Sequence, residues 1–303
     1  MKTTDFIKKT SILSTLSLGL ILSSASFAST GGGGGGGGGS TDSFDDLFSE
    51  AEDDGRCSVQ RVERSDSTFY VPTDPTNSSA KFHILGWGNG TGGTENTYST
   101  LLRSLASQCV LVAAANTDNS GTGEEIEDAV NDARSRYASK VLSNHKVCTS
   151  GHSQGGGGSF NAANRLDADC VIAIQADTRF TTTIYDDLAS DVEVIALWSE
   201  DDTLAPAGSE YFTSNTRNVE AASSILTEAE TANEDHFTIT SGRGGDIGSM
   251  FRMAVKAQLS NDSAEATRFR GAFWGPSTSS TVTTSASEIS EVERDSGAVN
   301  TQP

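Results

Sequence analysis

The chain has 303 residues, of which 35% are hydrophobic and 20% charged, and its 41 acidic and 21 basic side chains give a net charge of -20. This composition is that of neither a membrane protein nor a wholly disordered chain. A strongly anionic protein repels a phosphate backbone, so nucleic-acid binding and adsorption to anionic membranes are poor hypotheses. Without an N-terminal signal, a glycine run and a polar C-terminal stretch, about 236 residues remain at 40–275, and one α/β domain of ordinary size fits that length.

The N-terminus has the pattern of an export signal. Three lysines precede an apolar run at 12–22, and Ser26 and Ala28 supply the small residues expected before cleavage at Ser29. The apolar run is shorter than the about 20 residues of a membrane span, and Ser, Thr and Gly interrupt it. We therefore expect residues 1–28 to be a signal peptide and the product to be secreted or periplasmic, without membrane insertion.

Two further segments are low in core-forming residues. Residues 31–39 are all glycine, which predicts a flexible tether, and residues 41–54 are acidic with an occasional Phe or Leu, so we expect them to be disordered or loosely attached. Together they define a flexible linker at 29–55. A folded domain follows at 56–275, and we expect a Ser/Thr-rich disordered tail at 276–303.

Within the folded domain, apolar and β-branched runs predict strands that alternate with helices. The strands are expected at 69–71, 81–85, 110–114, 146–150, 170–174, 192–197 and 237–240. Helical faces occur at 98–105 and 126–137, the second opened by a capping box from Thr122 to Glu125, and a last helix is expected at 250–259. This alternation indicates an α/β fold, a mainly parallel sheet with helices on both faces.

A G-x-S-x-G sequence, Gly151-His152-Ser153-Gln154-Gly155, lies between the strand at 146–150 and a small-residue helix at 156–163. At such a strand-to-helix turn the glycines avoid clashes that a Cβ would cause, and the serine hydroxyl projects above the sheet. The N–H groups that begin the helix face developing negative charge. Ser153 is thus a candidate nucleophile, the alternative being a plain Gly/Ser loop.

A serine nucleophile needs a base, and the chain has four histidines. His83 and His145 precede the serine and His152 adjoins it. His236 is the one that lies downstream, in the order serine, acid, histidine that G-x-S-x-G hydrolases follow. We therefore assign His236 as the base.

The acid that orients this base is expected at the end of a strand between Ser153 and His236. The strand at 192–197 is followed by Glu200, Asp201 and Asp202, any of which can take this role. Asp177, after the preceding strand, is a rival. Asp235 is expected to be a solvated neighbour.

An oxyanion formed at the serine needs two N–H donors. One is the backbone N–H of Gln154, and the other is expected from the glycine-rich loop 86–93. A phosphate-binding role for this loop is disfavoured, because no Gly-Lys-Ser/Thr follows it.

These residues resemble the secreted polyester hydrolases and cutinases of the dienelactone-hydrolase branch, which include poly(ethylene terephthalate) hydrolases, over about residues 80–272. Residues 151–159 look like the family's extended G-H-S-M-G-G-G-G elbow. Glu200–Pro206 is similar to its E-N-D-x-I-A-P segment, which implies Asp202 as the acid, and Asp235-His236-Phe237 is similar to its S-H-F. The resemblance implies an α/β-hydrolase fold without a cap domain and a Ser153, Asp202, His236 triad that requires no cofactor and no metal.

The resemblance also implies the remaining site residues. Counting back from Leu105, Thr91 falls where the family has an aromatic oxyanion-hole residue, so the N–H groups of Gln154 and Thr91 would hold the oxyanion. Thr178 stands where a substrate-stacking Trp is common, and Gln154 replaces the usual Met. Three aromatic side chains are candidates either for the acyl groove or for the core: Trp87, Trp198 and Phe180.

The four cysteines, Cys57, Cys109, Cys148 and Cys170, form an even set in an oxidising destination, which favours disulfides. Three pairings are open, with buried free thiols as the alternative. Their spacing matches no zinc pattern, and no cysteine follows Cys170, so the family's C-terminal disulfide is missing.

The functional expectation is a monomeric serine ester hydrolase acting on polyesters or cutin-like esters. Between strands, residues 175–191 are too few for a large lid, so we expect an open site. Alternatives are a small-ester carboxylesterase, a chlorophyllase-like esterase, since that branch shares W-G-N-G loops and G-H-S-Q-G elbows, an amidase or peptidase, and a non-catalytic surface-binding protein. The acidic composition adds the hypothesis that the protein works in salty water.

Overall fold

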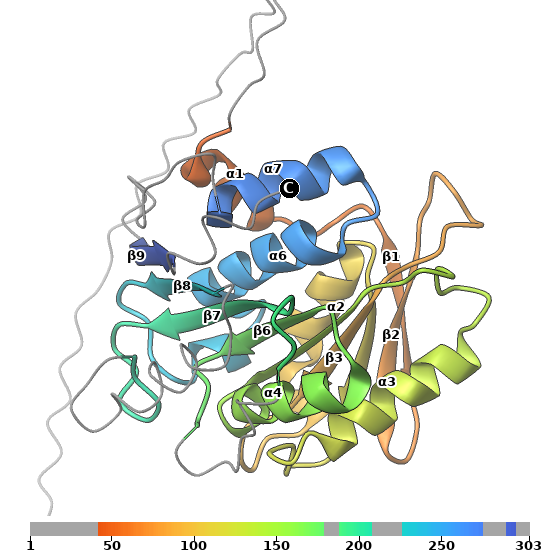
Figure 1. The fold of residues 1–303 in the computed structure, drawn as a ribbon, viewed down its shortest axis with the longest axis horizontal. Helices are drawn as coiled ribbons and strands as arrows, with labels where there is room; N and C mark the ends of the chain where they lie inside the picture. Colours follow the sequence, from red (N-terminus) through yellow and green to blue (C-terminus); the bar gives the residue numbers. More distant parts are fainter. Residues whose placement is uncertain (1–41, 179–187, 208–225, 275–288, 295–303) are drawn as a thin grey trace, which may run out of the picture. The chain divides into compact units, whose positions relative to one another are not determined.

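The computed structural model describes residues 42–178, 188–207, 226–274 and 289–294 (Figure 1). The expected signal peptide, the glycine tether and Phe180 lie outside the described residues, as does most of the expected tail. Those expectations therefore stay predictions.

The described residues form one nine-stranded sheet in the order β1-β2-β4-β3-β5-β6-β7-β8-β9. The strands are β1 (Ser58–Glu63), β2 (Ser67–Thr73), β3 (Ile84–Gly88), β4 (Leu111–Ala115), β5 (Val147–His152), β6 (Cys170–Ile174), β7 (Glu193–Ser199), β8 (Leu226–Thr231) and β9 (Ile289–Arg294). The six from β4 to β8 in this order are parallel, whereas β1, β2 and β9 pair antiparallel at the two edges. The expected mainly parallel sheet is confirmed.

Helices cover both faces of the sheet (Figure 1). They are α1 (Phe44–Ala51), η1 (Glu95–Tyr98), α2 (Ser99–Ser107), α3 (Glu124–Arg136), α4 (Gln154–Leu166), η3 (Thr238–Thr240), α6 (Gly245–Leu259) and α7 (Ser263–Trp274). The cluster of buried residues under α2 and α6 is separate from the one under α3 and α4. Successive strand residues alternate between these two cores, as the pleat requires.

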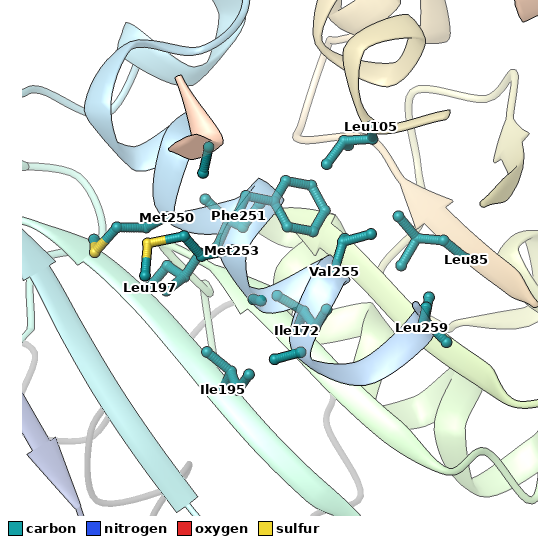
Figure 2. Packing of buried hydrophobic residues seen from close by; sticks show 14 of the residues in the cluster. Leu85, Leu105, Ile172, Ile195, Leu197, Met250, Phe251, Met253, Val255 and Leu259 are labelled. Atoms are coloured by element: carbon teal, nitrogen blue, oxygen red, sulfur yellow. The ribbon is translucent and has the colours of Figure 1, made fainter. Parts of the chain in front are cut away.

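The core under α6 shows this packing directly (Figure 2). Ile172 of β6 and Ile195 and Leu197 of β7 are fully buried in one cluster with Phe251 and Met253 of α6. Every residue of α6 from Ile247 to Leu259 is buried. This helix is therefore an inner layer, which α1 and α7 cover from outside.

The acidic segment expected to be loosely attached instead contains α1. Its apolar residues Phe44, Leu47, Phe48 and Ala51 recur at helical spacing and are buried. Ser43 opens the helix with a capping box to Asp46. The expectation of a flexible linker through residue 55 is therefore wrong for this part, because the apolar stripe outweighs the surrounding charge.

Three more expectations are corrected. The expected strand at 237–240 is the single turn η3, and the strand that precedes His236 is β8. The helix α3 has no capping box, since its N-cap is Gly123 at φ 77°, although Thr122 Oγ1 still donates to Glu125 at 3.1 Å. Residues 289–294 of the expected tail form β9 against β8.

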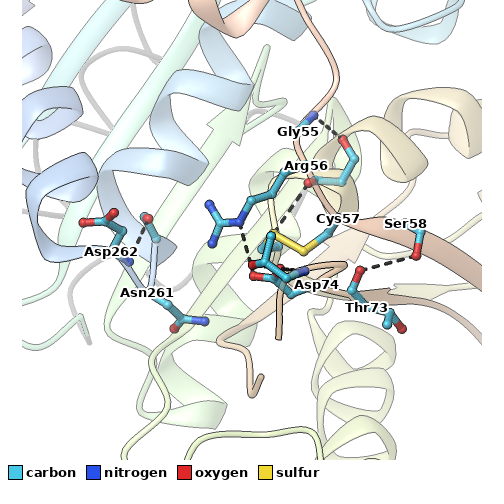
Figure 3. The surroundings of a disulfide bond; sticks show 12 residues. Gly55, Arg56, Cys57, Ser58, Thr73, Asp74, Asn261 and Asp262 are labelled. Atoms are coloured by element: carbon cyan, nitrogen blue, oxygen red, sulfur yellow. Dashed lines mark hydrogen bonds and ion pairs between the residues drawn. A yellow bond between two sulfur atoms is a disulfide. The ribbon is translucent and has the colours of Figure 1, made fainter. Parts of the chain in front are cut away.

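Two disulfides pair all four cysteines: Cys57 with Cys109 and Cys148 with Cys170. The first joins the start of β1 to the end of α2, and Figure 3 shows its surroundings. There Arg56 donates to Asp74 at 3.2 Å. Hydrogen bonds from Thr76, and then Arg56, lower the pKa of Asp74 to about 2. The second disulfide links directly paired residues of β5 and β6.

Candidate active site

Ser153 occupies the turn between β5 and α4, in a conformation that non-glycine residues rarely adopt. Its φ is 53° and its ψ is -117°, and it serves as the N-cap of α4. Such a conformation costs on the order of 1–3 kcal/mol and persists only where the surroundings enforce it. The tight strand-to-helix turn expected from the G-x-S-x-G motif is present.

The two glycines of the motif are required by close backbone approach. A Cβ on Gly151 would lie 2.3 Å from the carbonyl oxygen of Gly155. A Cβ on Gly155 would lie 2.2 Å from the carbonyl oxygen of Gly88 in β3. Neither contact can be relieved by moving a flexible side chain, so the sharp turn at Ser153 depends on both glycines.

His236 and Asp202 form a buried pair. His236 Nδ1 lies 2.8 Å from Asp202 Oδ2, and both side chains are almost fully buried. The other carboxylate oxygen of Asp202 accepts the N–H groups of Leu204 and Ala205 at 2.8 and 2.9 Å. These bonds fix the carboxylate and leave Oδ2 for the imidazole.

The pair is built from two loops at the carboxyl ends of parallel strands. Asp202 follows β7 and His236 follows β8, and the N–H of Asp201 donates to the carbonyl of Glu234 at 3.0 Å, which ties the loops together. Asp235, the expected solvated neighbour, accepts the N–H of Phe237 at 2.9 Å. Of the competing acids, the structure brings Asp202 to the histidine.

Ser153 and His236 line the same cleft, which has a volume of about 420 Å³. No hydrogen bond joins Ser153 Oγ to His236 among the described residues, and such bonds are often long without substrate. Leu204 and Phe237, 52% and 58% exposed, also line the cleft and are the large hydrophobic side chains exposed in the described part of the chain. The remaining lining residues are Gly90, Thr91, Gly92, Gly93, Thr97, Tyr98, His152, Asp177 and Thr240.

The glycine-rich loop lies beside the serine. A Cβ on Gly90 would be 3.3 Å from Ser153 Cβ, and Thr91 lines the cleft. Asn89 anchors the loop, because its amide donates to the carbonyls of Ala115 and Thr117 at 2.7 and 2.8 Å. Gln154 begins α4, where backbone N–H groups have no acceptor within the helix. Both expected oxyanion donors therefore belong to segments that adjoin Ser153.

The two residues expected to bind substrate, Trp87 and Thr178, do not line this cleft. Trp87 is fully buried between Tyr98 and Phe251, and its Nε1 donates to Asn89 at 3.0 Å, so it supports the loop from the core. Thr178 is buried and is not among the described residues that line the cleft. The assignment of Trp87 and Thr178 to substrate contact is therefore corrected. Trp198 is also a core residue.

Sequence reasoning missed the part played by His152 and Tyr98. The imidazole of His152 is buried, with its centroid 4.5 Å from that of His236, and burial and then the neighbouring His236 lower its pKa to about 3. The Tyr98 hydroxyl lies 2.8 Å from His152 Nδ1, and burial raises the pKa of Tyr98 to about 12. Apolar spacing assigned Tyr98 only to a helical face, and no sequence signal pairs it with His152.

Two other features of the structure have the shape or the residue types of a site. A cleft of about 750 Å³ lies at the amino ends of β5, β6 and β7, away from Ser153, and its lining includes Lys146, Asp169 and Glu193. Cys57, Asp74 and Cys109 are the one group in the described residues with metal-ligand proximity. Their two sulfur atoms are joined in a disulfide, so they are not thiolate ligands.

Comparison with known proteins found no family model that matches this chain and no match among curated proteins. Within the described residues, no helix has both the length and the apolar character needed to cross a membrane.

Proposed function

We propose that this chain is an α/β-hydrolase that cleaves carboxylic ester bonds with a Ser153, His236, Asp202 triad. The observation that carries the proposal is the Asp202 and His236 pair, which shares one cleft with a serine held in a strained strand-to-helix turn. The catalytic order along the chain agrees with this fold class. We also propose that the protein is exported, and its two disulfides support this.

In the proposed reaction, Ser153 Oγ attacks the acyl carbonyl as His236 takes its proton. Asp202 keeps the His236 proton on Nδ1 and stabilises the imidazolium. The N–H groups of Gln154 and Thr91 hold the oxyanion. His236 then protonates the departing alcohol, and a water activated by the same histidine hydrolyses the acyl-enzyme.

The cleft supports an apolar ester as substrate. Leu204 and Phe237 expose large apolar side chains that line the cleft beside the triad, where an apolar part of a substrate can pack against them. The described residues form no cap domain over the cleft, and a cleft left open in this way would admit a chain that extends beyond it, which fits a polyester or cutin-like ester. A small-ester carboxylesterase is the second candidate, because Thr91, which lines the cleft, offers no aromatic ring to stack on an aromatic acyl group.

The test is release of soluble acid from an amorphous polyester suspension, with Ser153→Ala as the control. Release that disappears in the variant would establish a serine polyester hydrolase. Cleavage of p-nitrophenyl esters without polyester release would leave the small-ester candidate. Failure of Ser153 to react with a fluorophosphonate would contradict both and favour a non-catalytic binding protein. Preferential cleavage of a matched anilide over the ester would favour an amidase.

A further inference from the structure

A second histidine lies against the proposed base, and the proposed reaction does not use it. His152 ends β5 directly before Ser153, and its ring centroid is 4.5 Å from that of His236. A positive charge on His152 would oppose the imidazolium that must form on His236. The proposed reaction therefore needs His152 to be neutral.

The Tyr98 hydroxyl adjoins one ring nitrogen of His152 and the backbone of Gly90. Its oxygen accepts the N–H of Gly90 at 3.2 Å and lies 2.8 Å from His152 Nδ1. A phenol has one proton, and the Gly90 bond uses a lone pair, so the proton is available to Nδ1. When the hydroxyl donates, His152 Nδ1 accepts, and the proton of the neutral imidazole is on Nε2.

The opposite edge of His152 faces the loop that carries the base. Its Nε2 and Gln175 Oε1 are both buried, and neither makes a hydrogen bond within the described residues. The Gln175 amide donates to the carbonyl of Asp235 at 3.1 Å. Although burial dominates and lowers the pKa of His152, the backbone of His236 and the side chain of Gln175 act to raise it, as acceptors for its proton do. Neither His152 Nε2 nor Gln175 Oε1 reaches a partner among these residues, so the support that the His152 ring gives to this loop comes from its contact with His236, whose ring centroid lies 4.5 Å away.

We propose that Tyr98 is a positioning residue that acts through His152. Its hydroxyl holds His152 in the Nε2–H tautomer, so the ring supports the His236 loop, and the same oxygen holds Gly90 beside Ser153. The inference rests on the proposed function. The Tyr98 hydroxyl would thereby connect the glycine-rich loop 86–93 with the loop that carries His236. The strand β5, which leads to Ser153, lies between these two loops.

The kinetic test is Tyr98→Phe, which removes only the hydroxyl. We expect kcat for a soluble p-nitrophenyl ester to fall about tenfold with KM within about twofold, because the lost hydrogen bonds orient groups that act in the transition state. Tyr137→Phe is the matched control, since Tyr137 packs on Phe69 in the other core. An unchanged kcat in the folded Tyr98 variant, or an equal loss in the control, would overturn the inference.

A spectroscopic test needs no substrate. In protein labelled with ¹⁵N-histidine, four imidazoles contribute, and His152→Gln identifies the signals of His152. We expect the wild type at pH 7 to carry the proton of His152 on Nε2, and Tyr98→Phe to lose this single tautomer. A proton on Nδ1 in the wild type would overturn the inference even if Tyr98→Phe failed to fold. Absence of ester hydrolysis by the wild type would instead refute the proposed function.

Discussion

Ser153 adopts its unfavourable conformation in a turn where the backbone packs closely on both sides. Gly151 and Gly155 each approach a carbonyl oxygen more closely than any side chain would permit. The motif could be recognised in the sequence because these steric requirements act over five consecutive residues. The choice of Asp202 over Asp177 came from family resemblance, and the structure supplies its physical basis in the hydrogen bond to His236.

Asp202→Asn tests that bond. The neutral amide cannot hold the proton on His236 Nδ1 in the same way and provides no negative charge for the imidazolium, so we expect kcat for a soluble ester to fall by about 10³ to 10⁴ with little change in KM. Steady-state kinetics measure this. Asp177→Asn is the matched control, because it removes the same charge from the same cleft, and it is expected to change kcat less than tenfold. A larger loss in the control would transfer the role to Asp177.

The lowered pKa of His152 predicts how the free energy of unfolding depends on pH. Burial lowers this pKa in the folded protein to about 3, below its ordinary value of 6.5, so the unfolded chain binds a proton that the folded protein rejects. Stability is therefore lost as pH falls from about 6.5 toward 3, by on the order of a few kcal/mol. Urea unfolding at several pH values measures the slope. His152→Gln should flatten it, and an unchanged slope in this variant would contradict the assignment.

At the scale of elements, α1 is held by its apolar stripe and by buried cations of α6. Arg252 donates to the carbonyl of Ala51, and Lys256 Nζ lies 2.9 Å from Glu50. Burial lowers the pKa of Arg252 to about 10. The backbone end of α1 is thus paired with a side chain more than 200 positions away in the sequence, which no local pattern predicts.

Phe48→Ala measures how firmly α1 is attached. Truncating a buried Phe removes apolar burial and leaves a cavity, so we expect a loss of about 3 kcal/mol in the free energy of unfolding. Urea denaturation gives this value. Phe237→Ala is the matched control, because its side chain is 58% exposed, and should change stability by about 0.5 kcal/mol or less. Equal effects would mean that α1 contributes little to the fold.

Elements with strong internal patterns were predicted best. The strand at 170–174 has the expected bounds, because five apolar residues lie between polar ends. By contrast, residues 237–240 are apolar and β-branched, yet they form a turn. The Asp235 carboxylate accepts the N–H of Phe237 at the start of this turn. The tail strand β9 forms only by pairing with β8. Local preference fails where a cap or a distant partner decides the conformation.

For the whole molecule, the charge imbalance acts over longer distances than the ion pairs. The described pairs have nitrogen to oxygen distances of 2.5 to 3.4 Å, and most involve partly exposed side chains that contribute at most about 1 kcal/mol each. The 20 excess negative charges instead repel one another across the protein surface. This repulsion destabilises the folded state. Salt therefore affects the contact ion pairs and the long-range repulsion unequally.

We expect the melting temperature to rise as sodium chloride increases from about 0.02 to 0.5 M. The Debye length falls from more than 10 Å to about 4 Å over this range, so long-range repulsion is screened while contact pairs are weakened less. Scanning calorimetry measures the shift. Choline chloride at equal ionic strength is the control, because screening does not depend on the identity of the cation. A rise with sodium alone would indicate specific cation binding, and a steady fall in both salts would contradict the repulsion argument and the saline hypothesis.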